Sequence, residues 1–136
     1  MISKKDLELV ELATKIIKER WHKGSINHTV GSALRAKDGK VYLGVNLDMD
    51  GMHSVCGEQV AFGNALTEGV TEFDTIVAVG YTGGEVTILA PCGSCRQFMS
   101  KYAPDIKVII KEDGVLKKVK FDELLPHAYK LHLERS

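Results

Sequence analysis

The first third of the chain changes from a helical to an extended pattern of apolar residues. From Ser3 to Arg20 the apolar positions recur every three or four residues, which places them on one face of a helix. Two short apolar runs follow at 30–34 and 41–45, and between them Lys-Asp-Gly-Lys at 37–40 is a strong turn sequence. The pattern therefore predicts an amphipathic helix and then a β-hairpin.

The rest of the chain interleaves β-branched runs with helical ones. Residues 46–54 have no period and are interpreted as a loop, and the charged stretch at 117–120 as a solvated edge. Strands are predicted at 75–81, 86–89 and 106–111, and helices at 55–66, 93–102 and 121–129. We expect an α/β fold, a three-layer α/β/α sandwich with a mixed five-stranded sheet, in one domain over residues 1–136.

Composition narrows the class of protein. The 136 residues are 44% hydrophobic and 26% charged, which suits one globular domain with a core of its own. Eighteen basic and eighteen acidic residues give no net charge, so nothing favours a polyanionic partner. No run approaches the roughly 18 apolar residues of a membrane span, and the N-terminus lacks a secretory signal. We expect a soluble, cytoplasmic protein without nucleic-acid or membrane partners.

Three cysteines, Cys56, Cys92 and Cys95, are the first candidates for chemistry. An odd number without an export signal indicates thiol chemistry or metal binding, and no disulfide framework. Cys92 and Cys95 are three residues apart at the start of a predicted helix, so their side chains face one direction, and Cys56 opens another helix. Three thiolates suit zinc and leave its fourth position for water, which is typical of a catalytic site.

Glu58 is the candidate catalytic residue. Two positions after a metal ligand, its carboxylate can reach a zinc-activated water without binding the metal. It can then carry a proton to a ring nitrogen and to a leaving amine. A three-ligand zinc site beside such a glutamate adds hydroxide to an electrophilic carbon and expels ammonia, which is deamination.

Other interpretations of these residues are possible. A C-x-x-C pair is also a redox motif, although the third cysteine and its glutamate argue against that function. A non-catalytic protein with a closed structural zinc site could use His53, Cys56, Cys92 and Cys95. A deaminase of single-stranded nucleic acid would need a cationic groove with aromatic rings, and 7% aromatic residues with no net charge argue against one.

The chain resembles the cytidine deaminase family, and its small size also resembles blasticidin S deaminase. The resemblance is carried by Cys-Gly-Glu at 56–58 and Pro-Cys-Gly-Ser-Cys-Arg-Gln at 91–97, with further matches at 30–34, 39–46 and 123–126. It implies a zinc hydrolase of pyrimidine salvage. The expected substrate is a cytosine-type nucleoside (cytidine, deoxycytidine or an analogue such as blasticidin S), and the products are its uracil form and ammonia. It also implies a homotetramer in which neighbouring subunits complete each pocket.

The same resemblance assigns roles to residues that bind substrate. Asn46 would bond the 3′-hydroxyl of the sugar, backbone groups near Gly57 would bind the base edge, and Tyr129 would reach across the subunit interface. Two positions depart from the family: Asp48 stands where a glutamate is usual, and His28 where an aromatic ring stacks on the base. These departures leave the preferred nucleoside open.

Two further positions bear on the charge of the zinc site. The residue after Glu58 is often arginine in family members with three cysteines, but here it is Gln59. Three thiolates exceed the charge of zinc by one, so a positive group nearby would favour a bound hydroxide. Arg96, next to Cys95, is the expected charge compensator.

Overall fold

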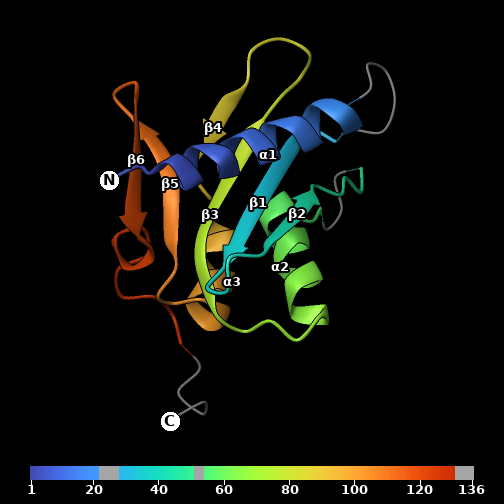
Figure 1. Cartoon of the computed structure of the whole chain (residues 1–136). Coiled ribbons are helices and arrows are strands. Elements are labelled where there is room, and N and C mark those ends of the chain that lie inside the picture. Colours follow the sequence, from blue (N-terminus) through green and yellow to red (C-terminus); the bar gives the residue numbers. More distant parts are fainter. Residues whose placement is uncertain (22–27, 51–53, 131–136) are drawn as a thin grey trace.

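A mixed β-sheet separates one long helix from two shorter ones in the computed structural model, which describes residues 1–21, 28–50 and 54–130 (Figure 1). Helix α1 lies across one face of the sheet, and α2 and α3 cover the other. The helices are α1 (Lys4–Arg20), α2 (Gly57–Thr67) and α3 (Gly93–Tyr102). The strands are β1 (Val30–Ala36), β2 (Val41–Val45), β3 (Phe73–Gly80), β4 (Thr87–Leu89), β5 (Lys107–Glu112) and β6 (Val115–Lys120).

The sheet confirms the predicted architecture and corrects the strand count. Its order is β2-β1-β3-β5-β6, with β4 paired to β3 beyond the end of β5. Strands β3 and β5 are parallel, whereas the other pairs are antiparallel. The described residues form six strands, where five were predicted, because the charged stretch at 117–120 belongs to β6. The lysines obscured the alternation of apolar and polar residues that predicts a strand. One of its inward positions is Lys118, which reaches a buried carboxylate.

Alternate side chains of the central strands fill two separate cores. Ile76 of β3 packs with Phe62 and Met99 from α2 and α3. Val77, the next residue, packs with Leu9 of α1 on the other face. This alternation confirms the three layers that the sequence predicted.

The predicted helices are confirmed in position, with one exception. Ser3 caps α1 through a reciprocal pair of bonds with Asp6, and α3 spans the predicted residues. The helix predicted at 121–129 is wrong: a single 3₁₀ turn, Phe121–Glu123, stands there, and Pro126 cannot continue a helix. No helix in the described part of the chain is long and apolar enough to cross a membrane.

Helix α2 packs unusually close to strand β2 at Gly44. A Cβ atom on Gly44 would lie 2.5 Å from the carbonyl oxygen of Gly57 and closer still to the amide nitrogen of Ala61. Only glycine permits this contact, which fixes the first turns of α2 against the sheet. This packing also fixes the position of Cys56, the residue that precedes α2, relative to the sheet.

Aromatic side chains join the end of α1 to the end of β3. Trp21 contacts Tyr81 edge to face with 5.5 Å between ring centroids, and the chain contains no other tryptophan. The amide of Tyr81 donates to the carbonyl of Thr29, next to the start of β1. Gly83 lies against the indole, where a Cβ atom would come within 2.6 Å of it.

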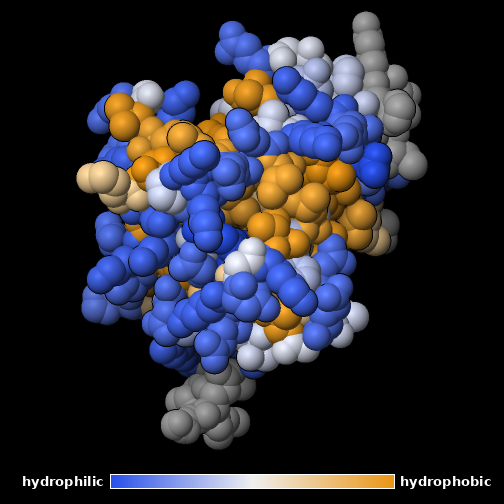
Figure 2. Space-filling model, viewed as in Figure 1, coloured by the Kyte–Doolittle hydropathy of each residue, from blue (hydrophilic) through white to orange (hydrophobic). Residues whose placement is uncertain are grey.

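Part of the molecular surface is apolar. Figure 2 shows apolar side chains gathered beside α1 and over the neighbouring edge of the sheet. Strand β2 contributes half-buried residues on the α1 side, and α1 contributes exposed ones: Val41, Leu43, Val45, Leu7 and Leu12. Apolar surface of this kind is typical of contacts between protein chains.

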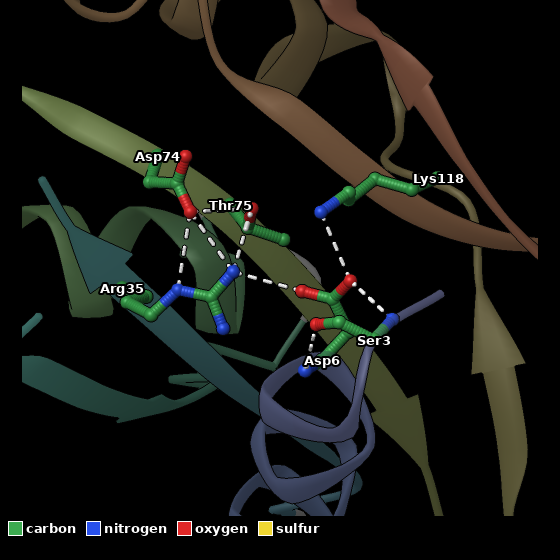
Figure 3. A network of polar contacts seen from close by, with 6 residues as sticks. All are labelled: Ser3, Asp6, Arg35, Asp74, Thr75 and Lys118. Carbon is green, nitrogen blue, oxygen red and sulfur yellow. Dashed lines mark hydrogen bonds and ion pairs between the residues drawn. The ribbon is translucent and has the colours of Figure 1, made fainter. Parts of the chain in front are cut away.

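A buried charge network ties α1 to three strands (Figure 3). The carboxylate of Asp6 is fully buried and accepts from Arg35 of β1 at 2.8 Å, from Lys118 of β6 at 2.9 Å and from the amide of Ser3 at 2.9 Å. Arg35 also donates twice to Asp74 of β3, at 3.1 and 2.9 Å. Burial alone would raise the pKa of Asp6, but these donors outweigh it and hold that pKa well below its usual range.

We expect Asp6→Asn to lower the free energy of unfolding by about 3–5 kcal/mol, because it leaves Arg35 and Lys118 without their buried partner. Urea unfolding followed by circular dichroism measures this. The matched control is Glu19→Gln, which removes an exposed pair with Lys15 and should change stability by less than about 0.5 kcal/mol. Equal losses in the two variants would contradict the role of the network.

The network also predicts how stability depends on pH. The pKa of Asp74 is lowered as well, because hydrogen bonds from Arg35 outweigh the effect of burial. Carboxyls whose folded pKa is depressed contribute fully above their unfolded pKa of about 3.9 and lose that contribution as pH falls further. The stability difference between wild type and Asp6→Asn should therefore be constant near neutral pH and shrink below about pH 4. A difference independent of pH would contradict this.

Candidate active site

Three sulfur atoms meet where helices α2 and α3 begin. The Sγ atoms of Cys56, Cys92 and Cys95 all lie within 4.8 Å of one another, and those of Cys56 and Cys92 are 3.3 Å apart. Cys56 is the N-cap of α2 and Cys92 the N-cap of α3, while Cys95 lies in the first turn of α3 and is buried. Tetrahedral zinc with bonds of about 2.3 Å needs sulfurs about 3.8 Å apart, so the cluster fits zinc.

The surroundings of the sulfurs oppose ionisation of two of the three thiols. Burial, with the nearby thiols and the Glu58 charge, raises the pKa of Cys56 to about 11 and also raises that of Cys95. The pKa of Cys92 is lowered in spite of burial, because its sulfur accepts from the amide of Cys95 at 3.4 Å. A positive ion would stabilise the thiolate forms of all three cysteines together, and three thiolates select zinc over harder metals.

Glu58 lies at the wall of a cavity beside these sulfurs. Its side chain is only 6% exposed, and burial raises its pKa. The cavity has a volume of about 260 Å³. The residues that line it come from β1, the segment between β2 and α2, the start of α2, the end of β4 and the segment after β4: Val30, Asn46, Ser54, Val55, Cys56, Gly57, Glu58, Leu89, Ala90 and Cys92. Glu58, Cys56 and Cys92 thus line one open pocket.

Asn46 and His28 lie together at the edge of this space. The Asn46 side-chain oxygen accepts from the amides of Thr29 at 2.8 Å and Val30 at 3.0 Å, which fixes the amide group beside the start of β1. The Nδ1 atom of His28 is 2.8 Å from the Asn46 carbonyl oxygen. Asn46 is among the residues that line the cavity, and His28 contacts its backbone.

Asp48 is linked to the cavity through Ser54, a residue that the sequence analysis did not single out. The Ser54 hydroxyl donates to the carboxylate of Asp48 at 3.5 Å and accepts from the amide of Met49 at 3.4 Å. Ser54 lines the cavity. No sequence motif marks this serine, because its importance comes only from its contact with Asp48 and its place in the cavity wall.

The remaining predicted substrate residues occupy different places. Gly57 lines the cavity, and a Cβ atom on it would lie 3.2 Å from the Val30 carbonyl oxygen, so alanine would need a small shift there. Tyr129 is not among the residues that line the cavity of its own subunit. It is 70% exposed, and its carbonyl accepts from Gln97 of α3 at 2.8 Å.

Gln59 contacts one of the sulfurs, whereas the side chain of Arg96, the expected charge compensator, contacts the backbone. The Gln59 side-chain nitrogen donates to the Cys95 sulfur at 3.8 Å and to the Ser94 hydroxyl at 3.0 Å. The Arg96 guanidinium donates to the carbonyls of Pro91 at 2.8 Å and Leu124 at 2.9 Å, which braces the segment before α3. His53, the fourth ligand of the alternative structural cage, lies outside the described residues.

Comparison with known proteins places this site in a family. Residues 3–111 match the model of the cytidine and deoxycytidylate deaminase zinc-binding region. A blasticidin-S deaminase of Bacillus cereus is 40% identical over 94% of both chains, and a cytidine deaminase of Sporosarcina psychrophila is 32% identical over 91% of both. The crystal structure of a cytidine deaminase from Burkholderia pseudomallei has a TM-score of 0.73 and 34% identity, covering 90% of this chain and 98% of that one.

The matched region contains both zinc motifs, and the similarity extends over almost the whole chain. The three sulfurs lie close enough to bind one ion, as a zinc site of this family requires. This chain belongs to the cytidine and deoxycytidylate deaminase family and is a zinc-dependent hydrolase.

Proposed function

We propose that the chain deaminates a cytosine-type nucleoside (cytidine, deoxycytidine or an analogue such as blasticidin S) to its uracil form and ammonia. The observation that carries the proposal is the buried Glu58 carboxylate on the wall of a cavity shared with Cys56 and Cys92. Curated relatives that carry both substrate names support the range of nucleosides.

The metal and the carboxylate divide the chemistry. Zinc, held by Cys56, Cys92 and Cys95, supplies Lewis acidity that makes water nucleophilic near neutral pH. Glu58 accepts a proton of the attacking water and delivers it to N3 of the base. The water oxygen bonds to C4 as a hydroxyl. Glu58 then takes the remaining proton of this hydroxyl and passes it to the 4-amino nitrogen, so that the C4–N bond breaks, ammonia leaves and the C4 carbonyl of the uracil form remains. Its low exposure keeps this proton from exchanging with bulk water.

Other cavity residues would orient the substrate. We assign Asn46 to the 3′-hydroxyl of the sugar, because its bonds to the amides of Thr29 and Val30 hold its side-chain amide in one orientation. Asp48 would accept from a sugar hydroxyl, backbone groups near Gly57 would bind the base edge, and His28 would stack on the ring. The contact of His28 with the Asn46 carbonyl would couple its ring to the sugar site.

The assembled enzyme would be a cytoplasmic homotetramer that acts in pyrimidine salvage. A volume of about 260 Å³ is just below the roughly 300 Å³ at the lower end of ligand sites, which supports completion of the pocket by a neighbour. The exposed Tyr129 side chain and the apolar surface in Figure 2 are available for contacts between copies. A reducing compartment would keep the three thiols able to bind metal. Arg96, the residue after Cys95, would compensate the net negative charge of the zinc and its three thiolates.

A panel of 4-amino pyrimidine nucleosides, assayed for ammonia release by the zinc-loaded protein, tests the function. We expect turnover of cytidine, deoxycytidine or blasticidin S, and the ranking of kcat/KM identifies the preferred one. Zinc bound in full with no turnover of any member would refute the function and favour a structural metal site.

Glu58→Gln should lower kcat on the best substrate by at least about 100-fold, because the amide cannot carry the proton. Zinc content, measured by atomic emission, should stay at the wild-type level. The matched control is Glu68→Gln, at the exposed C-cap of the same helix, which should leave kcat unchanged. Retained turnover in Glu58→Gln would rule out its assigned role.

Asp48→Asn should raise KM for cytidine by about tenfold with little change in kcat, because a hydrogen bond from a hydroxyl to a charged acceptor contributes roughly 1.5 kcal/mol. Among 2′-, 3′- and 5′-deoxycytidine, the two proteins should have similar KM values for the nucleoside that lacks the hydroxyl bound by Asp48. The same increase in KM with all three nucleosides would place Asp48 away from the sugar hydroxyls.

A further inference from the structure

The side chain of Gln59 connects the first turn of α2 with the first turn of α3. Its nitrogen is 3.0 Å from the Ser94 hydroxyl and 3.8 Å from the Cys95 sulfur. Gln59 is half-buried, and Cys95 is only 1% exposed. The contact with the Cys95 sulfur is therefore partly shielded from water, which strengthens its electrostatic effect, whereas Ser94 is exposed.

The orientation of the amide follows from the chemistry of its two neighbours. A thiolate bound to a metal has no proton, so it can only accept, and the Gln59 amide must turn its N–H group toward Cys95. The Ser94 hydroxyl can accept from the same nitrogen and so favours this orientation. Together these residues aim a neutral donor at one ligand of the metal.

The charge of the metal site gives this donor its importance. Three thiolates exceed the charge of zinc by one. Among the described residues, the N–H groups that donate to these sulfurs are those of the Ser94 and Cys95 backbone and of the Gln59 side chain, and all are neutral. The nearest arginine in sequence, Arg96, donates to two backbone carbonyls.

We propose that Gln59 is a positioning residue of the zinc site, which withdraws negative charge from the Cys95 thiolate while Ser94 fixes its amide. Less charge on this sulfur means weaker donation to zinc, and the ion remains a stronger Lewis acid for the reaction proposed above. The inference rests on that function only for its catalytic consequence, since the effect on the sulfur requires no substrate.

The test replaces zinc with Co²⁺, whose sulfur-to-metal charge-transfer absorption reports the charge on the thiolates. In Gln59→Leu this absorption should move to longer wavelength, because a sulfur without its donor gives up electrons more easily. Zinc affinity, measured by competition with a chromophoric chelator, should fall about 10- to 100-fold, because the excess negative charge of the zinc–thiolate site loses one of the donors that stabilise it. Gln59→Arg, which restores an N–H donor, should move the absorption back and recover the affinity.

Two further variants separate this role from a structural one. Ser94→Ala should produce a smaller shift in the same direction, and it keeps the proposal testable if Gln59→Leu does not fold. Gln97→Leu makes the same chemical change on α3, where the glutamine contacts Ser100 and Tyr129, and should leave the absorption unchanged. An unshifted absorption in folded Gln59→Leu, or in Ser94→Ala if Gln59→Leu does not fold, would overturn the proposal, whether or not zinc affinity changes. If the wild-type protein shows the sulfur-to-Co²⁺ absorption but its zinc form turns over no nucleoside, the proposed function is refuted and the proposal for Gln59 is not.

Discussion

The contact of α2 with β2 at Gly44 is the constraint on which the site depends. Because no side chain stands between helix and strand, the first turn of α2 lies directly on the sheet, with the carbonyl of Gly57 next to Gly44. Cys56 caps this helix and Cys92 caps α3, so the packing of two helices on one face decides whether their sulfurs meet. A shift of α2 by the width of a methyl group would exceed the tolerance of a metal–sulfur bond, about 0.2 Å, many times over.

The chain buries like charges in two places and stabilises them in different ways. Near the start of α1, the carboxylate of Asp6 is neutralised by Arg35 and Lys118, which the protein itself supplies. At the start of α2, Glu58 and three thiols gather around a space where the described residues place no comparable cation. The Asp6 cluster stabilises the packing of α1 on the sheet, whereas the thiolates and Glu58 are stable together in their charged forms only with a metal ion.

Sequence reasoning reached the architecture and the metal ligands for identifiable reasons. Helices α1 and α3 have clear starts and regular apolar spacing, and cysteines at two helix starts leave few alternatives to a metal site. The sixth strand was missed because Lys118 occupies an inward position that only its partner Asp6 explains. Ser54 and the Gln59–Ser94 contact could not be foreseen, since they depend on how loop and helix starts face each other in space.

The indole of Trp21 gives the molecule an optical reporter of its own. It rests on Tyr81, whose amide bonds to Thr29, and the following residue, Val30, forms part of the cavity wall. One ring contact and one hydrogen bond thus separate the chain's single strong fluorophore from the space beside the sulfurs. Occupation of that space can change the emission of the unlabelled protein, so ligand binding could be followed without turnover.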